Sequence, residues 1–468
     1  MKISTIAIST IVVLGIAATG GSWYSGKQVE EHYQEWVSQG NGVLKKLELY
    51  GIQAEIKDMN LKRHFFSSDT TYNIEAKVDG ETYIFKGQDK LNHGPFPLNR
   101  LLSGNIVPAM ASIESHITIP TELRQYFTKD ELLSGISTIS YGGDISGSIT
   151  TQQFSFDDAH GNVSAVDVDF AVDKSGKTDL SIQLPLFKVD NAKKGLLDIQ
   201  NLNYTINFKY NKSYNFLTTG DSLLKIDSFV MHNQHQDDRF IKLNELKVDA
   251  STSLNNDRFD EKTQANFNLI VTKNGKEQEL GHLKLDGGFQ LDAPSLEEYM
   301  YYLTQPDKID SQEANNVAIK LFRKNPQLHI NELSIKNSEG KNNIKWIMNL
   351  QTEDVDFDKK NINLLELFQS LVNSKFNLNI DINSAKKLIS QVMILDDVSE
   401  DEALNQAKNT INRLVNEVKS SHYFVVDKNN IKLNAEIDEG KLILNGNPLS
   451  NSEVQGMIFA LILGLGML

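Results

Sequence analysis

Apolar and polar residues alternate one by one along much of the first 291 residues of the chain. Such alternation is typical of antiparallel strands that have one face on a core and one face in water. It is strict over Leu180–Leu186 and recurs in most stretches from about 136 to 291. Asp79-Gly80 and Asn274-Gly275 each separate two such runs and favour tight hairpin turns. Because no crossover helix interrupts the runs, the pattern predicts a long, meandering and curved antiparallel sheet.

Helical spacing is concentrated in the C-terminal third, where helices alternate with further strands. The expected helices span 295–303, 311–324, 383–395 and 399–420; the expected strands span 328–335, 344–350, 376–382, 431–437 and 441–444, with a turn at Asn445-Gly446. A further short helix is expected over 121–133. The sequence thus predicts an α+β fold dominated by strands, in which the helices of the last third pack on the sheet.

The helix expected over 399–420 carries the strongest local signals. Ser399 and Glu402 have the spacing of a capping box, in which hydroxyl and carboxylate satisfy free backbone N–H groups. Its apolar positions are spaced three and four residues apart: Leu404, Ala407, Ile411, Leu414 and Val418. The stripe favours packing on the sheet, and a coiled-coil seam is the alternative, although about two heptads are short for one.

The N-terminal segment predicts a membrane anchor. Ile3–Trp23 is uncharged and has about the 20 residues that a bilayer-crossing helix requires. Lys2 precedes it and Trp23 and Tyr24 close it, as expected for a cytoplasmic N-terminus and an interfacial aromatic pair. The alternative is a cleaved signal peptide, because small residues near position 18 offer a cleavage site. In both cases the rest of the chain is exported.

Four regions follow from these patterns. They are a transmembrane anchor over 1–24, an amphipathic juxtamembrane helix over 25–48, an antiparallel β domain over 49–291 and a mixed helix and strand region over 292–468. The chain closes on the apolar run Met457–Leu468, which is too short to cross a bilayer. A buried terminal helix or a tail that dips into a membrane would explain this run.

The composition of the chain excludes several classes of function but does not identify one. The 468 residues carry a net charge of −14, which argues against nucleic acid and against non-specific adhesion to anionic headgroups. The chain has no cysteine, so disulfides, thiolate chemistry and a lipidated N-terminal cysteine are excluded. No nucleotide-binding glycine motif and no nucleophile elbow is present. The expectation is a protein that is not an enzyme and holds no cofactor or metal.

Three short segments are the remaining candidates for a site. His93, Gly94, Pro95, Phe96 and Pro97 form either a loop that contacts a partner or a rigid corner with Phe96 in the core. His232 and His235, followed by Asp237 and Asp238, fit a solvated hairpin tip better than a metal site, because the context is strand and turn. The glycines of Tyr141–Gly147 are expected to bend the sheet.

Several strings in the same order resemble one family. They are TGGSWYSGK (19–27), HGPFPL (93–98), IVPAMASIES (106–115), ISYGGDISG (139–147) and GKLILNGNPLS (440–450), and together they are similar to the YdgA-type family of uncharacterised proteins of Gram-negative bacteria. The resemblance implies an inner-membrane anchor, a periplasmic domain and self-association, and it supplies no catalytic residues. The meandering strands are also similar in style to AsmA-like envelope proteins, whose curved sheets form an apolar groove for lipids. That second likeness is one of architecture alone.

These observations lead to two functional hypotheses. The first is a non-enzymatic, membrane-anchored envelope protein whose periplasmic sheet offers an apolar groove or face to a lipid or a protein partner. The second is an oligomeric structural or assembly module of the cell envelope. A sheet whose apolar face is fully covered by its own helices would argue against the first hypothesis.

Overall fold

The computed structural model describes residues 41–42, 44, 52–78, 80–156, 160–191, 195–211, 213–214, 216–232, 239–303, 311–352, 355, 368–421, 423–438 and 440–456. The anchor expected over 1–24, with Lys2, Trp23 and Tyr24, lies outside these residues, as do most of 25–48, Asp79, His235, Asp237, Asp238 and Met457–Leu468. Over the described ranges, the helices are all too short or too polar to cross a bilayer.

The strands of the described chain belong to one 22-stranded sheet whose pairings are antiparallel. This confirms the β-dominated fold and the antiparallel pairing expected from the alternation. Internal contacts divide the chain into two compact units, which are described separately below. Unit 1 comprises residues 1–210 and 222–227, and unit 2 comprises residues 211–221 and 228–468.

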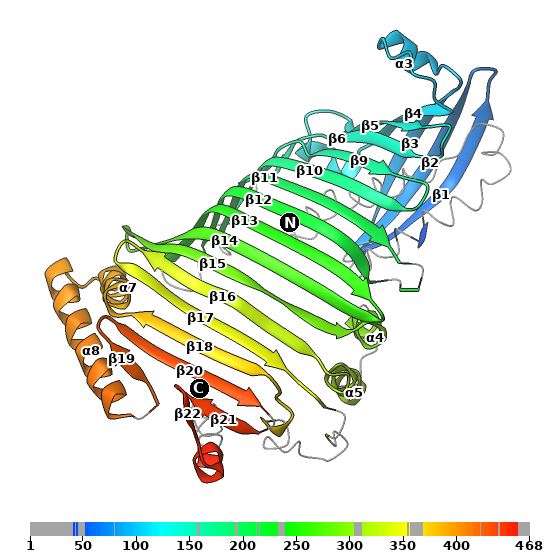
Figure 1. Cartoon of the computed structure of the whole chain (residues 1–468). Coiled ribbons are helices and arrows are strands. Elements are labelled where there is room, and N and C mark those ends of the chain that lie inside the picture. Colours follow the sequence, from blue (N-terminus) through cyan, green and yellow to red (C-terminus); the bar gives the residue numbers. More distant parts are fainter. Residues whose placement is uncertain are drawn as a thin grey trace. The chain divides into compact units, whose positions relative to one another are not determined.

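The described part of unit 1 after residue 51 is a meander of strands with a short α-helix and a 3-10 helix between them (Figure 1). Its elements are β1 (Ile52–Arg63), β2 (Ser67–Val78), β3 (Glu81–His93), α3 (Leu98–Leu102), β4 (Ala111–Thr118), η3 (Thr121–Tyr126), β5 (Glu131–Ile139), β6 (Ile145–Thr151), β7 (Phe154–Phe156), β8 (Gly161–Val163), β9 (Asp167–Val172), β10 (Lys177–Asn191) and β11 (Gly195–Tyr210). Each strand from β1 to β6 pairs with the next, β6 pairs with β9, and β9 pairs with β10.

The core of unit 1 lies on one face of this meander, as strict alternation requires. On β2 and β3, Ile74 and Phe85 are opposite each other and are both at most 1% exposed. Ile117 and Leu133 continue the buried layer onto β4 and β5. Leu44, which precedes β1, belongs to the same hydrophobic cluster.

Two local expectations in unit 1 are wrong. Helix covers only Thr121–Tyr126 of the segment 121–133, and the chain is already in β5 at Glu131, because Leu133 and Ile139 complete the buried layer. Tertiary burial outweighs the weak helical pattern there. Gly142 and Gly143 do not bend a strand; they lie in the turn between β5 and β6, where Gly143 has a φ of 88°. Gly147 does lie in a strand, β6, but the pairing of β6 with β5 has no bulge there.

Unit 2 contains longer strands and the α-helices of the last third. Its elements are β13 (Arg239–Asn255), β14 (Arg258–Lys273), β15 (Lys276–Asp292), α4 (Ala293–Leu303), α5 (Ser311–Phe322), β16 (Gln327–Asn337), β17 (Gly340–Asn349), β18 (Ser374–Asp381), α7 (Ile382–Leu395), α8 (Glu400–Ser420), β19 (Val425–Asp427), β20 (Asn430–Asp438), β21 (Lys441–Leu444) and β22 (Asn447–Pro448), and β12 (Thr218–His232) contributes to both units. The predicted turns at Asn274-Gly275 and Asn445-Gly446 are confirmed, with positive φ at all four residues.

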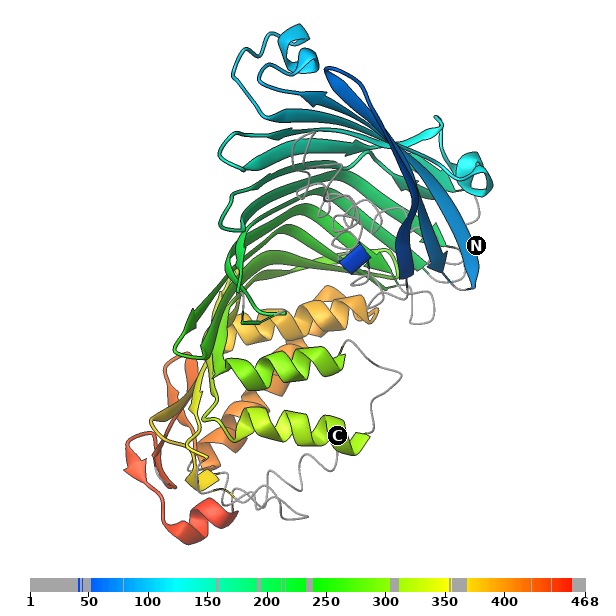
Figure 2. The same ribbon diagram turned by 90° about the vertical axis from the view of Figure 1, so that its right-hand side faces the viewer.

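The helices of unit 2 stand at the two ends of its strands. Figure 1 shows α7 at one end of β15 to β18 and α4 and α5 at the other end. Figure 2 shows that α4, α5 and α7 all extend from the same side of the sheet. Ala293 and Leu296 of α4 form a buried cluster with Leu217 and Phe259. The middle of the strands is therefore bordered by helices at both ends.

Helix α8 differs from its prediction in two ways. The Ser399 side chain makes no capping bond, and Glu402 instead accepts a bond from Gln406, one turn further on. The buried positions are Ala403, Ala407, Ile411 and Val418, whereas Leu404 is 56% exposed. The buried face packs against α7, with β19 also in contact, so the helix is covered mainly by another helix and not by the sheet. No continuous coiled-coil stripe remains on its outer side.

Candidate apolar ligand site

Strands β15 to β18 present one apolar face because their register aligns aliphatic residues in rows. Leu285 lies opposite Leu333, Leu333 opposite Ile344, and Ile344 opposite Leu378. The neighbouring row begins with Leu283 opposite Ile335. Successive side chains of a strand point to opposite faces, so these rows all lie on the same side of the sheet.

A bulge in β16 preserves this face along the whole strand. Ile330 pairs with Trp346 and Leu333 pairs with Ile344, so two residues of β16 stand between pairs that are separated by one residue of β17. Such a bulge shifts the alternation by one residue, and Ile330 and Leu333 therefore share a face. Plain alternation would have placed them on opposite faces.

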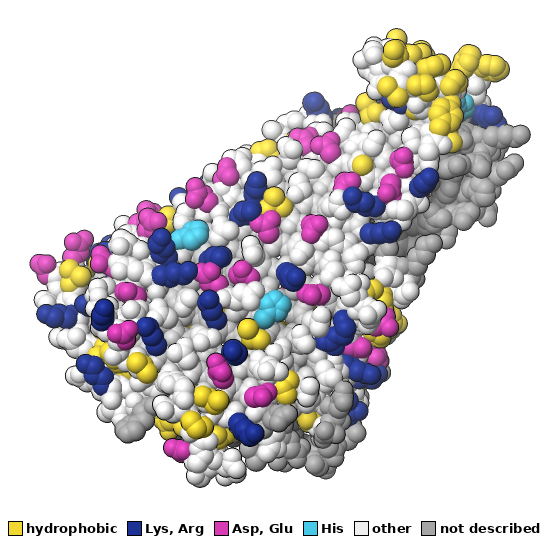
Figure 3. Space-filling model, viewed as in Figure 1, with side chains coloured by type: hydrophobic (Ala, Val, Ile, Leu, Met, Phe, Trp, Pro, Cys, Tyr) yellow, Lys and Arg dark blue, Asp and Glu magenta, His cyan; other side chains and the backbone are white. Residues whose placement is uncertain are grey.

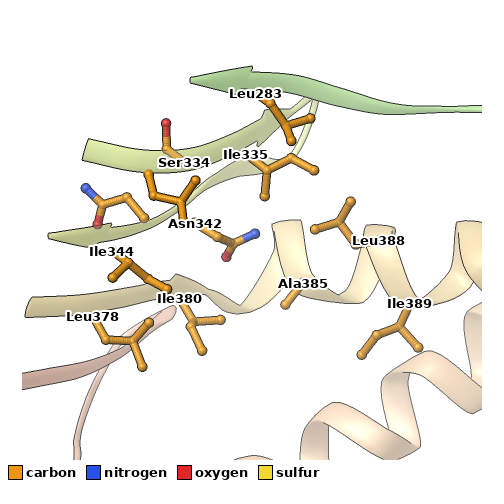
Figure 4. Close-up of a pocket in the computed structure, with 12 residues that line it drawn as sticks. Leu283, Ser334, Ile335, Asn342, Ile344, Leu378, Ile380, Ala385, Leu388 and Ile389 are labelled. Atoms are coloured by element: carbon orange, nitrogen blue, oxygen red, sulfur yellow. The ribbon is translucent and has the colours of Figure 1, made fainter. Parts of the chain in front are cut away.

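A cavity of about 490 Å³ lies between this face and helix α7. Its lining is mostly aliphatic and comes from four strands and the helix: Leu283, Leu333, Ile335, Ile344, Leu378, Ile380, Ala385, Leu388 and Ile389, with Ser334, Asn342 and Asn343. Figure 4 shows Ile335 on the side of the sheet that faces Leu388 of α7, while Ser334 points away. Its volume is in the range of small-molecule sites, roughly 300–1,000 Å³.

Polar contacts hold the N-terminal end of α7 against the sheet. The Asp381 carboxylate caps the helix by accepting bonds from the backbone N–H groups of Asn383 (3.0 Å) and Ser384 (2.8 Å). The Asn342 side chain accepts from the Asp381 N–H at 2.9 Å and donates to the Ser384 hydroxyl at 2.8 Å. The Asn337 side chain donates to the Ser384 carbonyl oxygen at 3.0 Å. These polar contacts thus fix the N-terminal end of α7, and their side chains do not fill the cavity.

The C-terminal end of α7 is held by the β14–β15 hairpin. Lys273 pairs with Asp396 at 2.8 Å, and Lys276 pairs with Asp397 at 3.1 Å. The Asn274 side chain donates to the Asp397 carboxylate at 2.6 Å. These lysines lower the pKa of both carboxyl groups from the usual value of 3.8, because they bond to the charged forms. Ala385 and Leu388 therefore lie between two fixed ends of one helix.

The opposite face of the same strands is charged. Glu332 accepts a bond from Lys284 at 2.9 Å and pairs with Lys341, and these bonds lower the pKa of Glu332 to about 2. Ile347, next to Trp346 on β17, is an isolated apolar side chain on this charged face. The two faces of β16 and β17 therefore differ sharply in their affinity for apolar surface.

The apolar face continues beyond the cavity into solvent. Leu285, Leu328, Leu333 and Trp346 are between 36% and 40% exposed. We call these four residues the open apolar face. Since Leu333 also lines the cavity, the cavity and the open apolar face are continuous. Among the described residues, the helices therefore leave part of this apolar face uncovered.

The segment His93–Pro97 lies in unit 1 and takes no part in this site. Gly94 is required for close approach and not for an unusual backbone angle, since a Cβ there would lie 2.1 Å from the Ala109 carbonyl oxygen. Phe96 is 49% exposed, so the alternative that its ring fills the core is wrong. Whether the segment contacts a partner stays a prediction.

The other candidate groups do not form a reactive centre in the described residues. The His232 ring stacks on Phe240, and no group of His, Asp and Glu among the described residues could hold a metal ion. Asp89 is a buried carboxyl in unit 1, and burial raises its pKa to about 6. It accepts a bond from the Tyr72 hydroxyl at 3.3 Å, and burial together with Asp89 raises the pKa of Tyr72 well above 10.0.

The fold and this site define the class of protein: an antiparallel β-sheet protein with an apolar cavity, open to solvent, between its sheet and one helix. Residues 1–452 match the family described as "Bacterial protein of unknown function (DUF945)", and the chain belongs to that family.

Two relatives that are similar over nearly the whole chain support this family and the YdgA-type resemblance. Protein YdgA of Escherichia coli (strain K12) is 25% identical over 497 residues, which cover 98% of this chain and 97% of the relative. The uncharacterized protein YihF of the same organism is 22% identical over 502 residues, with 96% and 97% covered. An uncharacterized protein of Haemophilus influenzae is 34% identical over 116 residues, 25% of this chain and 32% of the relative. No solved structure matches the chain.

Proposed function

We propose that the protein is a non-enzymatic, membrane-anchored envelope protein that holds the acyl chain of a lipid in the cavity beneath α7. The observation that carries the proposal is the continuity between this aliphatic cavity and the open apolar face. Each methylene group that moves from water into such a site contributes about 0.8 kcal/mol. The uncharged segment Ile3–Trp23 supports the anchor, because it has the length and polarity of a bilayer-crossing helix.

The geometry favours a chain-like guest over a polar one. Asn342 is the polar residue of the lining that points toward α7, and its side chain already bonds to Asp381 and Ser384. A polar ligand in the cavity would have to give up its bonds to water without replacing them. A lipid can instead place its acyl chain in the cavity and leave its headgroup in solvent, past Leu333. We infer no catalysis at this site.

Tryptophan fluorescence of the full chain tests this proposal. The chain has three tryptophans, so replacing Trp23 and Trp36 with Phe leaves Trp346, on the open apolar face, as the single emitter. A fatty acid brominated in mid-chain should quench this emission in a saturable way, since bromine quenches at close range. The matched control carries Trp346→Phe and Ile347→Trp, which moves the emitter to the charged face of the same strand, where little quenching is expected.

A second pair of variants tests the cavity itself. Ala385→Phe places a ring in the cavity and should abolish saturable quenching and lower the amount of lipid that co-purifies. Val392→Phe adds the same ring to α7 at a side chain that is 49% exposed, and it should leave both measurements unchanged. Equal quenching on the two faces of β17, or unchanged lipid content in Ala385→Phe, would contradict the proposal.

A further inference from the structure

Unit 1 carries a dense cluster of exposed apolar side chains at one end of its sheet. Phe65 and Phe66 follow β1, and Leu98, Leu102, Ile106 and Val107 lie in the connection between β3 and β4. These six residues, which we call the apolar tip, are between 57% and 87% exposed. Figure 3 shows hydrophobic side chains gathered over α3. Exposed apolar side chains at this density mark an interaction surface more often than an ordinary monomer surface.

The two loops of the apolar tip are fixed to each other by hydrogen bonds. The His93 N–H donates to the Phe66 carbonyl oxygen at 2.9 Å, and the His93 ring bonds to the Ser68 hydroxyl at 3.0 Å. On the other side of the connection, the Gly94 N–H donates to the Met110 carbonyl oxygen at 2.8 Å. The apolar tip is therefore built on the ends of β2, β3 and β4.

Bonds further along the connection hold α3 in place. The Asn99 side chain donates to the Ser112 hydroxyl on β4 at 2.9 Å, and the Ala109 N–H donates to the Pro95 carbonyl oxygen at 3.0 Å. Phe65 and Phe66 contact each other edge to face, with ring centroids 4.5 Å apart. The backbone that carries the exposed side chains is thus already ordered by these bonds. Little conformational entropy is therefore lost when the apolar tip binds.

The charge around the apolar tip is opposite in sign to that of the whole chain. The segments 61–68 and 91–113 contain Lys62, Arg63 and Arg100 and no Asp or Glu, although the chain has a net charge of −14. The nearest acidic residues already have partners: Asp69 pairs with His64 at 3.0 Å, and Glu114 accepts from Asn92 at 2.9 Å. Apolar side chains flanked by cations are the combination that binds anionic membrane surfaces.

We propose that the apolar tip inserts into the headgroup region of a bilayer that contains anionic phospholipid. Aromatic and aliphatic side chains at such a depth leave water, while Arg63 and Arg100 stay level with the phosphates. A second copy of the chain suits the surface less well, because tip-to-tip contact would bring like charges together. The surface is independent of the cavity beneath α7, and either proposal can fail without the other.

Site-specific labelling of the full chain tests the insertion. Because the chain has no cysteine, Leu102→Cys gives a single site for a polarity-sensitive fluorophore. The matched control is Ile84→Cys, which lies toward the other end of β3 at a side chain that is 45% exposed. The labelled chain is reconstituted in vesicles of phosphatidylethanolamine and phosphatidylglycerol. A lipid with a nitroxide on its acyl chain is placed either in the same vesicles or in separate acceptor vesicles.

Insertion predicts a blue-shifted emission at position 102. It also predicts nitroxide quenching there, with the nitroxide lipid in the same vesicles, in the acceptor vesicles or in both. Neither effect is expected at position 84. Phosphatidylcholine vesicles should give weaker quenching, and Arg63→Glu with Arg100→Glu should lower binding by about tenfold or more. The double substitution Phe65→Ser with Phe66→Ser should also lower binding to these vesicles. Equal, water-like emission at the two positions would overturn the proposal. A blue shift at position 102 that grows with the number of protein molecules per vesicle, and that does not depend on lipid composition, would also overturn the proposal. It would indicate that a second copy of the chain covers the apolar tip.

Discussion

The buried carboxyl of Asp89 predicts a measurable dependence of unit 1 stability on pH. Asp89 is 6% exposed, opposite Thr70 on β2 and Ser115 on β4. Burial is the largest influence on its pKa, which rises to about 6 in spite of bonds from the Ser115 and Tyr72 hydroxyls that favour the charged form. The Thr70 hydroxyl, on the same face, makes no hydrogen bond that would compensate for the buried charge.

The sign and size of the effect follow from proton linkage. A carboxyl whose pKa is raised on folding binds more protons in the folded state between its unfolded value of 3.8 and about 6. Stability therefore falls as pH rises through this window, and the full penalty remains above it. A gap of about two pKa units corresponds to about 3 kcal/mol. Asp89→Asn removes the charge with almost no change of shape and should recover about 1–3 kcal/mol at pH 7.5, since some bonds to the carboxylate weaken.

Hydrogen exchange of the full chain, followed in peptides from β3 and β4, measures this difference within unit 1. Protection in Asp89→Asn should exceed that of the unaltered chain at pH 7.5, and the two should converge near pH 4, after correction for the intrinsic exchange rate. Asp169→Asn, at an exposed position on β9, is the control and should change protection by less than about 0.5 kcal/mol. Parallel pH profiles for Asp89→Asn and the unaltered chain would refute the reasoning.

Two further substitutions test single contacts. Gly94→Ala puts a methyl group 2.1 Å from the Ala109 carbonyl oxygen and should destabilise the start of β4 by about 1–3 kcal/mol in exchange measurements, whereas Gly42→Ala, with no atom within 4 Å, should not. Glu332→Gln should lower the stability of β16 at pH 7, because a carboxyl whose pKa falls on folding stabilises the fold above its usual pKa. That difference should disappear as the pH falls from about 4.5 to 2, and a constant difference over this range would contradict it.

The strands were predictable from sequence because their burial follows a period of two. The runs over Leu180–Leu186 and on both sides of Asn274-Gly275 lie in β10, β14 and β15 as expected, and the turn residues have the positive φ that such hairpins need. The predictions of secondary structure fail where tertiary contacts determine the local conformation. Residues 127–133 read as helix, yet burial of Leu133 beside Ile117 extends them toward β5.

The cavity was not predictable for a different reason. Its strands and helix were all expected, but no local pattern reveals that Leu285, Leu333 and Ile344 share a row, since this depends on pairing register across three strands. The bulge in β16 even reverses the face that simple alternation gives to Ile330. The one available signal was the aliphatic spacing of Ala385, Leu388 and Ile389 on a helix that follows a strand. That spacing alone indicates an ordinary packed helix.

The polar contacts at the two ends of α7 explain how an apolar cavity of this size can persist. An empty cavity costs about 24 cal/mol per Å³. For about 490 Å³, this approaches 12 kcal/mol, comparable to the whole stability of a typical domain. A helix held only by apolar packing would move inward and close the space, whereas Asp381 and Asn342 at one end and Asp396 at the other fix its distance from the sheet. The cavity cannot be a sealed void at that cost, and Leu333 shows that it is open. An apolar guest would remove the aliphatic lining of this open cavity from water, so binding at this site would stabilise unit 2 as well as retain the ligand.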